Sequence, residues 1–242
     1  MDILLTELMK YKRTAILWMI LIGGFLTAGT GFLLLSSEEG PAGWEGYFAT
    51  GMNCINLLAL LLIAVFTGYV LIGEYQEGTA KVLFTYPVSR IKIFISKHFV
   101  VFCFVILLYF TFFISALIFG TAYTGELPAG EFMFKMLKFS LLMSVMNFIL
   151  VPVTSAISLI IKGTGTYLFV GMGYFAIYVS FINSDYSLLI PPCIPNRLIE
   201  NYFISEFISS AQTINIVVVS ALTFIVFLTA GAAYYWKSDC LN

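Results

Sequence analysis

Charge is the scarcest property of this sequence. Only 10% of its 242 residues are Asp, Glu, Lys or Arg, against about 25% in a typical soluble domain. Hydrophobic residues make up 60%, and the mean hydropathy is +0.98. This composition excludes an ordinary soluble domain and predicts an all-α polytopic membrane protein. The formal net charge is −1, so nothing indicates a nucleic-acid partner.

Cysteine and histidine are also sparse. The four cysteines, at 54, 103, 193 and 240, show no paired spacing, and His98 is the single histidine. This pattern predicts neither a disulfide framework nor a metal site. Gly73-x4-Gly78-Thr79 lacks the Gly-Lys-Ser/Thr of a phosphate-binding loop. We therefore expect no catalytic residue, metal or cofactor in this chain. The first apolar run, of 22 residues, is too long for the core of a cleavable signal peptide.

Long apolar runs divide the chain into six predicted transmembrane helices. They cover residues 14–35, 50–73, 98–120, 136–161, 167–183 and 213–236. The first, with 22 residues, is long enough to cross a hydrocarbon core of about 30 Å. Pro152 interrupts the fourth run, and neighbouring helices are expected to pair with the carbonyl that it frees. Residues 184–212, rich in proline, are expected to form short helices or a re-entrant segment on the extracellular side. The whole chain is then one transmembrane domain, 1–242.

The distribution of lysine and arginine predicts the orientation. With the N-terminus inside, cytoplasmic segments hold nine of the twelve. These are Lys10, Lys12, Arg13, Lys81, Arg90, Lys92, Lys97, Lys162 and Lys237. Because cytoplasmic segments are enriched in these residues, both termini are expected in the cytoplasm.

The first 13 residues mix apolar side chains with Lys10, Lys12 and Arg13. This pattern is typical of a helix lying on the membrane surface with its basic residues at the lipid headgroups, although an irregular N-terminus is the alternative. Lys97 is expected to anchor the start of the third span in the same way. For Lys92 and Lys97, the alternative is that they only follow the general enrichment of cytoplasmic segments in basic residues.

The interiors of the six runs contain no Asp, Glu, Lys, Arg or His. Ion-coupled carriers usually keep ionisable groups near the membrane midplane, so the sequence argues against a self-powered secondary transporter. An intramembrane protease would need a base or a nucleophile pair there, whereas His98 stands alone at the edge of a run and is expected to be structural. The energy for any transport must come from another subunit.

The stretch 74–97, EYQEGTAKVLFTYPVSRIKIFISK, gathers charged residues between two apolar runs. Glu77 and Lys81 are four apart in the order that supports a helix, Pro87 ends that helix, and Ser89 can cap the next one. Residues 74–90 are therefore predicted to form a short amphipathic helix that receives force from a soluble protein.

The chain has six predicted spans, both termini inside and a basic N-terminal helix. Together with the stretch 74–97, these features resemble the permease subunit of an ABC-2 type transporter. The motif residues that match are Glu74, Glu77, Gly78, Thr79, Leu83, Pro87, Ser89, Arg90 and Lys97. The resemblance implies that 74–90 is the coupling helix, which sits in a cleft of a cytosolic ATPase. The residues expected to couple are Glu74, Glu77, Gly78, Thr79, Lys81, Leu83, Pro87, Ser89 and Arg90. The two glutamates can pair with basic residues of the ATPase, and Gly78 allows close approach of the two backbones.

The same resemblance implies an assembly in a bacterial cell membrane. Two permeases, identical or paralogous, would stand on two ATPase subunits that bind ATP and Mg. Glycines at 23, 24, 29 and 31 in the first span would let helices approach closely, either across such a dimer or within one subunit.

The cargo is predicted less directly. A pathway without buried charge suits an amphipathic molecule better than a small ion, and short permeases of this kind resemble those that export antimicrobial or toxic peptides. Amphipathic peptides are thus the expected cargo. The alternatives are an exporter of drugs, ions or lipid-linked glycans, an ATPase-recruiting sensor that transports nothing, and a membrane enzyme.

Overall fold

The computed structural model describes residues 2–12, 14–36, 43–76, 89–161, 163, 165–203 and 209–237. Within these ranges every element of regular structure is a helix, which confirms the predicted all-α class. The helices are α1 (Asp2–Lys10), α2 (Ala15–Ser36), α3 (Trp44–Gln76), α5 (Arg90–Thr124), α6 (Gly130–Phe148), α7 (Leu150–Ile161), α8 (Thr166–Phe181), η1 (Ser187–Leu189), α9 (Ile194–Phe203) and α10 (Ser210–Lys237).

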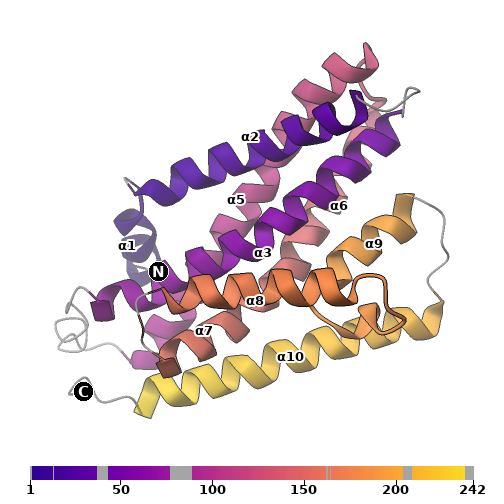
Figure 1. The fold of residues 1–242 in the computed structure, drawn as a ribbon. Coiled ribbons are helices and arrows are strands. Elements are labelled where there is room, and N and C mark those ends of the chain that lie inside the picture. The colour runs from indigo at the N-terminus through magenta and orange to yellow at the C-terminus, as the bar shows by residue number, and fades with distance from the viewer. Residues whose placement is uncertain are drawn as a thin grey trace.

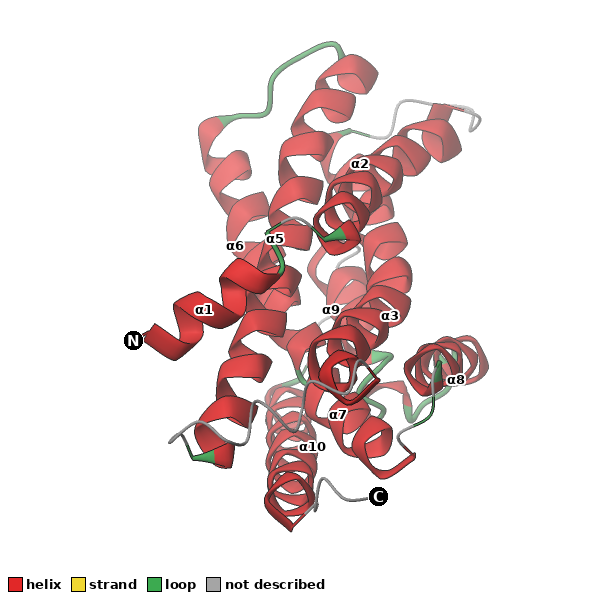
Figure 2. Cartoon of the chain, turned by 90° about the vertical axis from the view of Figure 1, so that its left-hand side faces the viewer, coloured by secondary structure: helices red, strands yellow, loops and turns green. Residues whose placement is uncertain are grey.

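The long helices run side by side as a bundle, with α2 and α10 at opposite edges (Figure 1). α1 lies crosswise to them at one end (Figures 1 and 2). The C-terminal ends of α3 and α10 and the start of α5 lie at this same end, which we call the α1 end. α1 and the C-terminal end of α10 thus lie at the same end of the bundle, as expected of a chain with both termini on one side.

α3 is the central helix, since it contacts α2, α5, α6, α7, α8 and α9. Its large side chains Tyr47, Phe48 and Phe66 are fully buried, and the Phe48 ring packs against Phe112 of α5 with ring centroids 6.0 Å apart. Burying aromatic side chains of this size is a large part of the packing of any helical core.

The glycines of α2 pack inside the chain. A Cβ added at Gly31 would lie 3.1 Å from the Cα of Gly51 in α3. One added at Gly24 would collide with the Thr111 hydroxyl and lie 2.8 Å from the backbone nitrogen of Phe112 in α5. Of the two expectations for these glycines, the structure supports close helix packing within one subunit.

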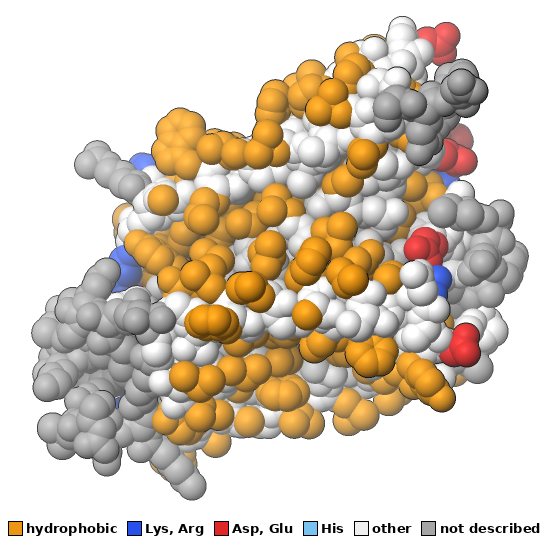
Figure 3. All heavy atoms as spheres, in the orientation of Figure 1, with side chains coloured by type: hydrophobic (Ala, Val, Ile, Leu, Met, Phe, Trp, Pro, Cys, Tyr) orange, Lys and Arg blue, Asp and Glu red, His pale blue; other side chains and the backbone are white. Residues whose placement is uncertain are grey.

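Within the described residues, five helical segments are long and apolar enough to cross a membrane. They are Ala15–Ser36, Trp44–Glu74, Arg90–Thr124, Gly130–Ile161 and Gln212–Trp236. α8 is apolar but has only 16 residues, about 24 Å of helix, so a sixth span remains a prediction. On the face shown in Figure 3, hydrophobic side chains cover the middle and charged side chains lie toward the two ends. These features describe a multi-pass membrane protein.

Two helices differ from the predicted runs in length. α3 has 33 residues and extends beyond the predicted span 50–73 at both ends. α5 has 35 residues and extends beyond the predicted span 98–120 at both ends. At the start of α3, the Trp44 indole donates to Glu126 O and Tyr47 donates to Ala28 O. These bonds to neighbouring elements stabilise helix beyond the apolar run, which hydropathy alone does not register.

The helix containing Pro152 is interrupted as expected. α6 ends at Phe148 and α7 begins at Leu150, because proline has no amide hydrogen to donate to the preceding turn. Tyr174 of α8 pairs with the Thr154 hydroxyl at 2.9 Å and donates to Leu150 O at 3.3 Å. A neighbouring helix therefore stabilises this break.

Candidate functional site

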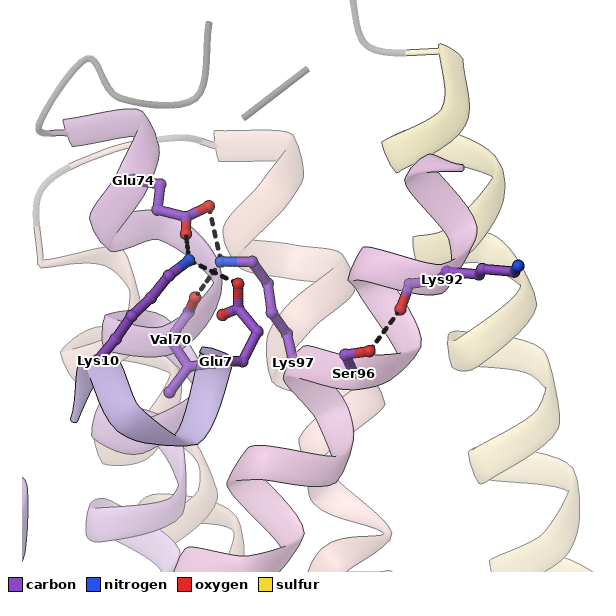
Figure 4. Close-up of polar contacts among 7 residues, drawn as sticks. All are labelled: Glu7, Lys10, Val70, Glu74, Lys92, Ser96 and Lys97. Atoms are coloured by element: carbon purple, nitrogen blue, oxygen red, sulfur yellow. Dashed lines mark hydrogen bonds and ion pairs between the residues drawn. The ribbon is translucent and has the colours of Figure 1, made fainter. Parts of the chain in front are cut away.

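Four charged side chains meet at the α1 end of the bundle. Glu7 and Lys10 come from α1, Glu74 from the last turn of α3, and Lys97 from the second turn of α5 (Figure 4). The Lys10 Nζ lies 2.5 Å from Glu7 Oε1 and 2.8 Å from Glu74 Oε1, and the Lys97 Nζ lies 2.8 Å from Glu74 Oε2. We call these four residues the ion-pair cluster. Glu74 is its centre, because each of its oxygens binds a different lysine.

Lys97 is fully buried, with 0% of its side chain exposed. Besides the ion pair, its ammonium donates to Val70 O at 2.8 Å. A buried charge without partners is very costly, so the position of Lys97 depends on Glu74. The structure thus corrects the prediction for Lys97, which lies inside the protein rather than at lipid headgroups. The Glu74 carboxylate already binds two lysines of its own chain, and its pairing with an ATPase stays a prediction.

Lys10 holds α1 to this cluster from a half-exposed position. Partial burial lowers the pKa of Lys10, but its hydrogen bonds to the Glu7 and Glu74 carboxylates outweigh that effect and raise the pKa overall. The Tyr11 ring adds an apolar contact, edge-on to Phe104 of α5 at 5.7 Å. α1 is therefore docked on the bundle by both charge and packing.

The other basic residues predicted to lie at the membrane surface are not part of the ion-pair cluster. Lys12 is exposed beyond the end of α1, so its contact with headgroups remains a prediction. Arg13 lies outside the described residues. Lys92 of α5 is exposed and points away from the ion-pair cluster (Figure 4).

On the far side of residues 77–88, Arg90 begins α5 and binds another helix. Its Nη1 donates to Trp236 O at 3.1 Å, in the last turn of α10. The last carbonyls of a helix have no helical partner and carry partial negative charge, so the guanidinium is well placed there. Ser89 occupies the N-cap position of α5, and its carbonyl accepts from the amide of Lys92 at 3.0 Å, while its hydroxyl makes no cap bond.

Both ends of the segment 77–88 are thus tied to other helices. The end at Glu74 is bound to α1 and α5, and the end at Arg90 is bound to α10. The predicted separate helix 74–90 is wrong at its ends, because Glu74 belongs to α3 and Arg90 to α5. Six predicted coupling residues lie outside the described residues: Glu77, Gly78, Thr79, Lys81, Leu83 and Pro87.

Comparison with known proteins identifies the family of this chain. Residues 3–181 match the family model described as ABC-2 family transporter protein. The chain belongs to the ABC-2 transporter family. It is also similar to the bacitracin transport permease protein BCRB of Bacillus licheniformis, with 25% identity over 200 residues, 81% of this chain and 92% of that protein. The chain is a transporter permease, and ABC-2 permeases work with a cytosolic ATPase subunit.

The permease also contains buried polar groups beyond the ion-pair cluster. His98 lies inside α5, where its Nδ1 is 2.9 Å from Phe94 O and its Nε2 is 3.1 Å from the Ser155 hydroxyl. With Lys97 beside it, α5 carries two buried ionisable side chains. Both residues stand at the start of the run, so hydropathy assigned them to its edge.

Further along the bundle, Asn56, Tyr109 and Asn147 form a hydrogen-bonded triad from α3, α5 and α6. The three side chains are 0–1% exposed. Their helical positions were readable from the sequence, but their mutual contact was not. Among the described residues, no group of three or more His, Cys, Asp or Glu could hold a metal ion.

Proposed function

We propose that this permease moves amphipathic peptides out of the cell or its membrane, using ATP hydrolysed by a separate ATPase subunit. ATP and Mg would bind to that subunit, and this chain would supply no catalytic residue. Two permeases, identical or paralogous, would stand on two ATPases in a bacterial cell membrane.

The observation that carries the coupling role is the anchoring of both ends of residues 77–88. A force applied to this segment acts on α3 directly, and the ion-pair cluster links α3 to α1 and α5. At the other end, Arg90 links the segment to α10. A push from an ATPase would therefore reach α1, α5 and α10, which supports 77–88 as the coupling segment.

The orientation follows from the same end of the molecule. Lys10, Arg90 and Lys97 gather at the α1 end, and the basic-residue rule assigns such an end to the cytoplasm. We infer that both termini are cytoplasmic, and that α8 is a short sixth span between α7 and the extracellular helices η1 and α9. A short apolar helix can be accommodated by local thinning of the bilayer.

The support for a peptide cargo is the name of a similar protein. The name of the Bacillus licheniformis relative refers to bacitracin, a peptide antibiotic, but that protein is only 25% identical to this chain. It therefore favours the peptide class among the alternatives of drugs, ions and glycans.

A survival experiment tests the proposal. A bacitracin-sensitive host would express the permease alone, with its candidate ABC ATPase, or with that ATPase inactivated at its phosphate-loop lysine. We expect protection against bacitracin only when the permease and the active ATPase are present together. Protection that does not need ATP hydrolysis would contradict the exporter, and protection against unrelated drugs but not bacitracin would contradict the cargo.

A further inference from the structure

A polar cavity of about 350 Å³ lies at the end of the bundle opposite the α1 end. The C-terminal end of α8 and the N-terminal end of α10 meet this end of the molecule (Figure 1). Six of the seven residues that line the cavity are polar: Ser184, Asp185, Ser187, Arg197, Asn201 and Gln212. They come from the segment after α8, from η1, from α9 and from the first turn of α10. The cavity is therefore shared by the whole connection between α8 and α10.

The cavity stands where the lipid-facing surface of the bundle ends. Val179 and Phe181 at the end of α8, and Ile214 near the start of α10, are exposed apolar side chains, as expected of helices in contact with lipid. Tyr186 and Tyr202 are also exposed, and each is next in sequence to a lining residue. Tyrosine is enriched at membrane–water interfaces. These neighbours place the cavity at the depth of the lipid headgroups.

Arg197 supplies the positive charge of the cavity. Its Nε donates to the Ser187 hydroxyl at 2.9 Å, and its Nη1 donates to Glu200 Oε2 at 2.7 Å. These two bonds fix the plane of the guanidinium and leave the two N–H groups of Nη2 without a partner among the described residues. The guanidinium group matches the geometry of a phosphate, so Arg197 is oriented to bind one.

Asp185 supplies a negative charge in the same cavity. Its carboxylate makes no ion pair or hydrogen bond within the described part of the chain. Because a carboxylate only accepts hydrogen bonds, it needs a donor, and a cationic donor binds most strongly. Asp185 and Glu200 together outnumber the one positive charge of Arg197. A simple anion would therefore be repelled, whereas a ligand with both a phosphate and an ammonium group would match both signs of charge.

We propose that this cavity binds the phosphoethanolamine headgroup of a membrane phospholipid, with the phosphate at Arg197 and the ammonium at Asp185. The acyl chains would lie against the exposed apolar side chains of α8 and α10. The volume of the cavity is near the lower limit of small-ligand sites, about 300 Å³, which suits a headgroup and not a whole peptide. The bound headgroup would tie η1 and α9 to the first turn of α10, whatever the cargo of the permease.

Native mass spectrometry of the purified full-length permease tests the headgroup. The protein in detergent is titrated with phosphatidylethanolamine, phosphatidylcholine or phosphatidylglycerol that carry the same acyl chains. All three have the phosphate, but choline has no N–H group to donate and glycerol has no positive charge. We expect phosphatidylethanolamine to bind about tenfold more tightly than the other two, the effect of one charge-assisted hydrogen bond. Equal or tighter binding of either other lipid would overturn the proposal.

Asp185→Asn tests the ammonium contact within the protein. Since Asp185 has no partner in the described part of the chain, this variant should fold. We expect it to lose the preference for phosphatidylethanolamine and to bind the other two lipids as the wild type does. Glu126→Gln, which changes an exposed carboxylate at the same end of the bundle, serves as the control and should keep the preference. Arg197→Gln should weaken binding of all three lipids. An unchanged preference in Asp185→Asn would refute the assignment.

Competition with bacitracin distinguishes a lipid in the cavity from one charged end of a peptide. We expect bacitracin to leave the binding of phosphatidylethanolamine to the wild-type permease unchanged. Displacement of the lipid by bacitracin, but not from the Glu126 site control lipid phosphatidylglycerol, would assign the cavity to the cargo and overturn the lipid proposal. That result would leave the exporter function intact, and failure of the survival experiment would in turn leave the lipid site intact.

Discussion

Replacing Lys97 by methionine tests the ion-pair cluster. The variant removes the ammonium that pairs with Glu74 at 2.8 Å, and methionine fills a similar space. Removing one partner of a buried ion pair costs about 3–5 kcal/mol, because the other charge is left uncompensated. Glu74 is 16% exposed and keeps Lys10 at 2.8 Å, and the Val70 carbonyl still lies within a helix. We therefore expect the lower figure, about 3 kcal/mol.

This loss can be measured as thermal unfolding of the purified permease in detergent. For a chain of this size, 1 kcal/mol corresponds to about 2–4 °C, so Lys97→Met should lower the midpoint by about 6–12 °C. Lys92→Met, in the same helix but exposed, should change stability by less than about 0.5 kcal/mol. Adding Glu74→Gln to Lys97→Met should recover part of the loss, since the uncompensated carboxylate is then gone. Equal midpoints for the Lys97 and Lys92 variants would show that the cluster does not hold the bundle together.

Three smaller effects follow from the packing. Arg90→Ala should lower the free energy of unfolding by about 1 kcal/mol and speed amide hydrogen exchange in the last turn of α10. Lys92→Ala should do neither. Equal exchange rates in the two variants would contradict a stabilising contact between Arg90 and α10. Gly24→Ala should overpack the α2–α5 contact and cost about 1–3 kcal/mol. At Gly29, the nearest atoms to an added Cβ belong to the Phe119 ring, at 3.5 Å or more, so Gly29→Ala should be neutral in the same unfolding assay. Similar losses of stability in Gly24→Ala and Gly29→Ala would contradict close packing at Gly24. Tyr174→Phe should cost about 1 kcal/mol and raise exchange in α7, and unchanged exchange would show that α8 does not stabilise the helix break.

Hydropathy predicted most of the helices because an apolar run long enough to span a bilayer has few other folded states. It was less informative at helix ends. Hydropathy placed the charged residues Arg90 and Lys97 outside the apolar run. Both are nevertheless helical in α5, since each has a partner elsewhere in the chain. Hydropathy averages over neighbours in sequence, and these partners are not neighbours.

The candidate site was only partly predictable for the same reason. Lys10 and Glu74 bind each other across 64 positions of sequence, so no local pattern reveals the pair. Glu74 was recognised as important through the family resemblance, but its binding to Lys97 within the chain was not foreseen. The helical spacing of Ser140, Ser144 and Asn147 is visible in the sequence, but only the packing shows that they face inward.

The coupling of residues 77–88 to an ATPase is tested most directly by co-purification. The wild-type permease would be purified beside Glu77→Lys/Gly78→Trp and beside Glu126→Lys/Gly130→Trp, a matched control at the opposite end of the bundle. Gly130 has open space around it, so the control should fold. We predict that an ABC ATPase co-purifies with the wild type and the control but not with the variant at 77 and 78. Equal recovery with all three, or with none, would contradict the assignment of this segment as the coupling site.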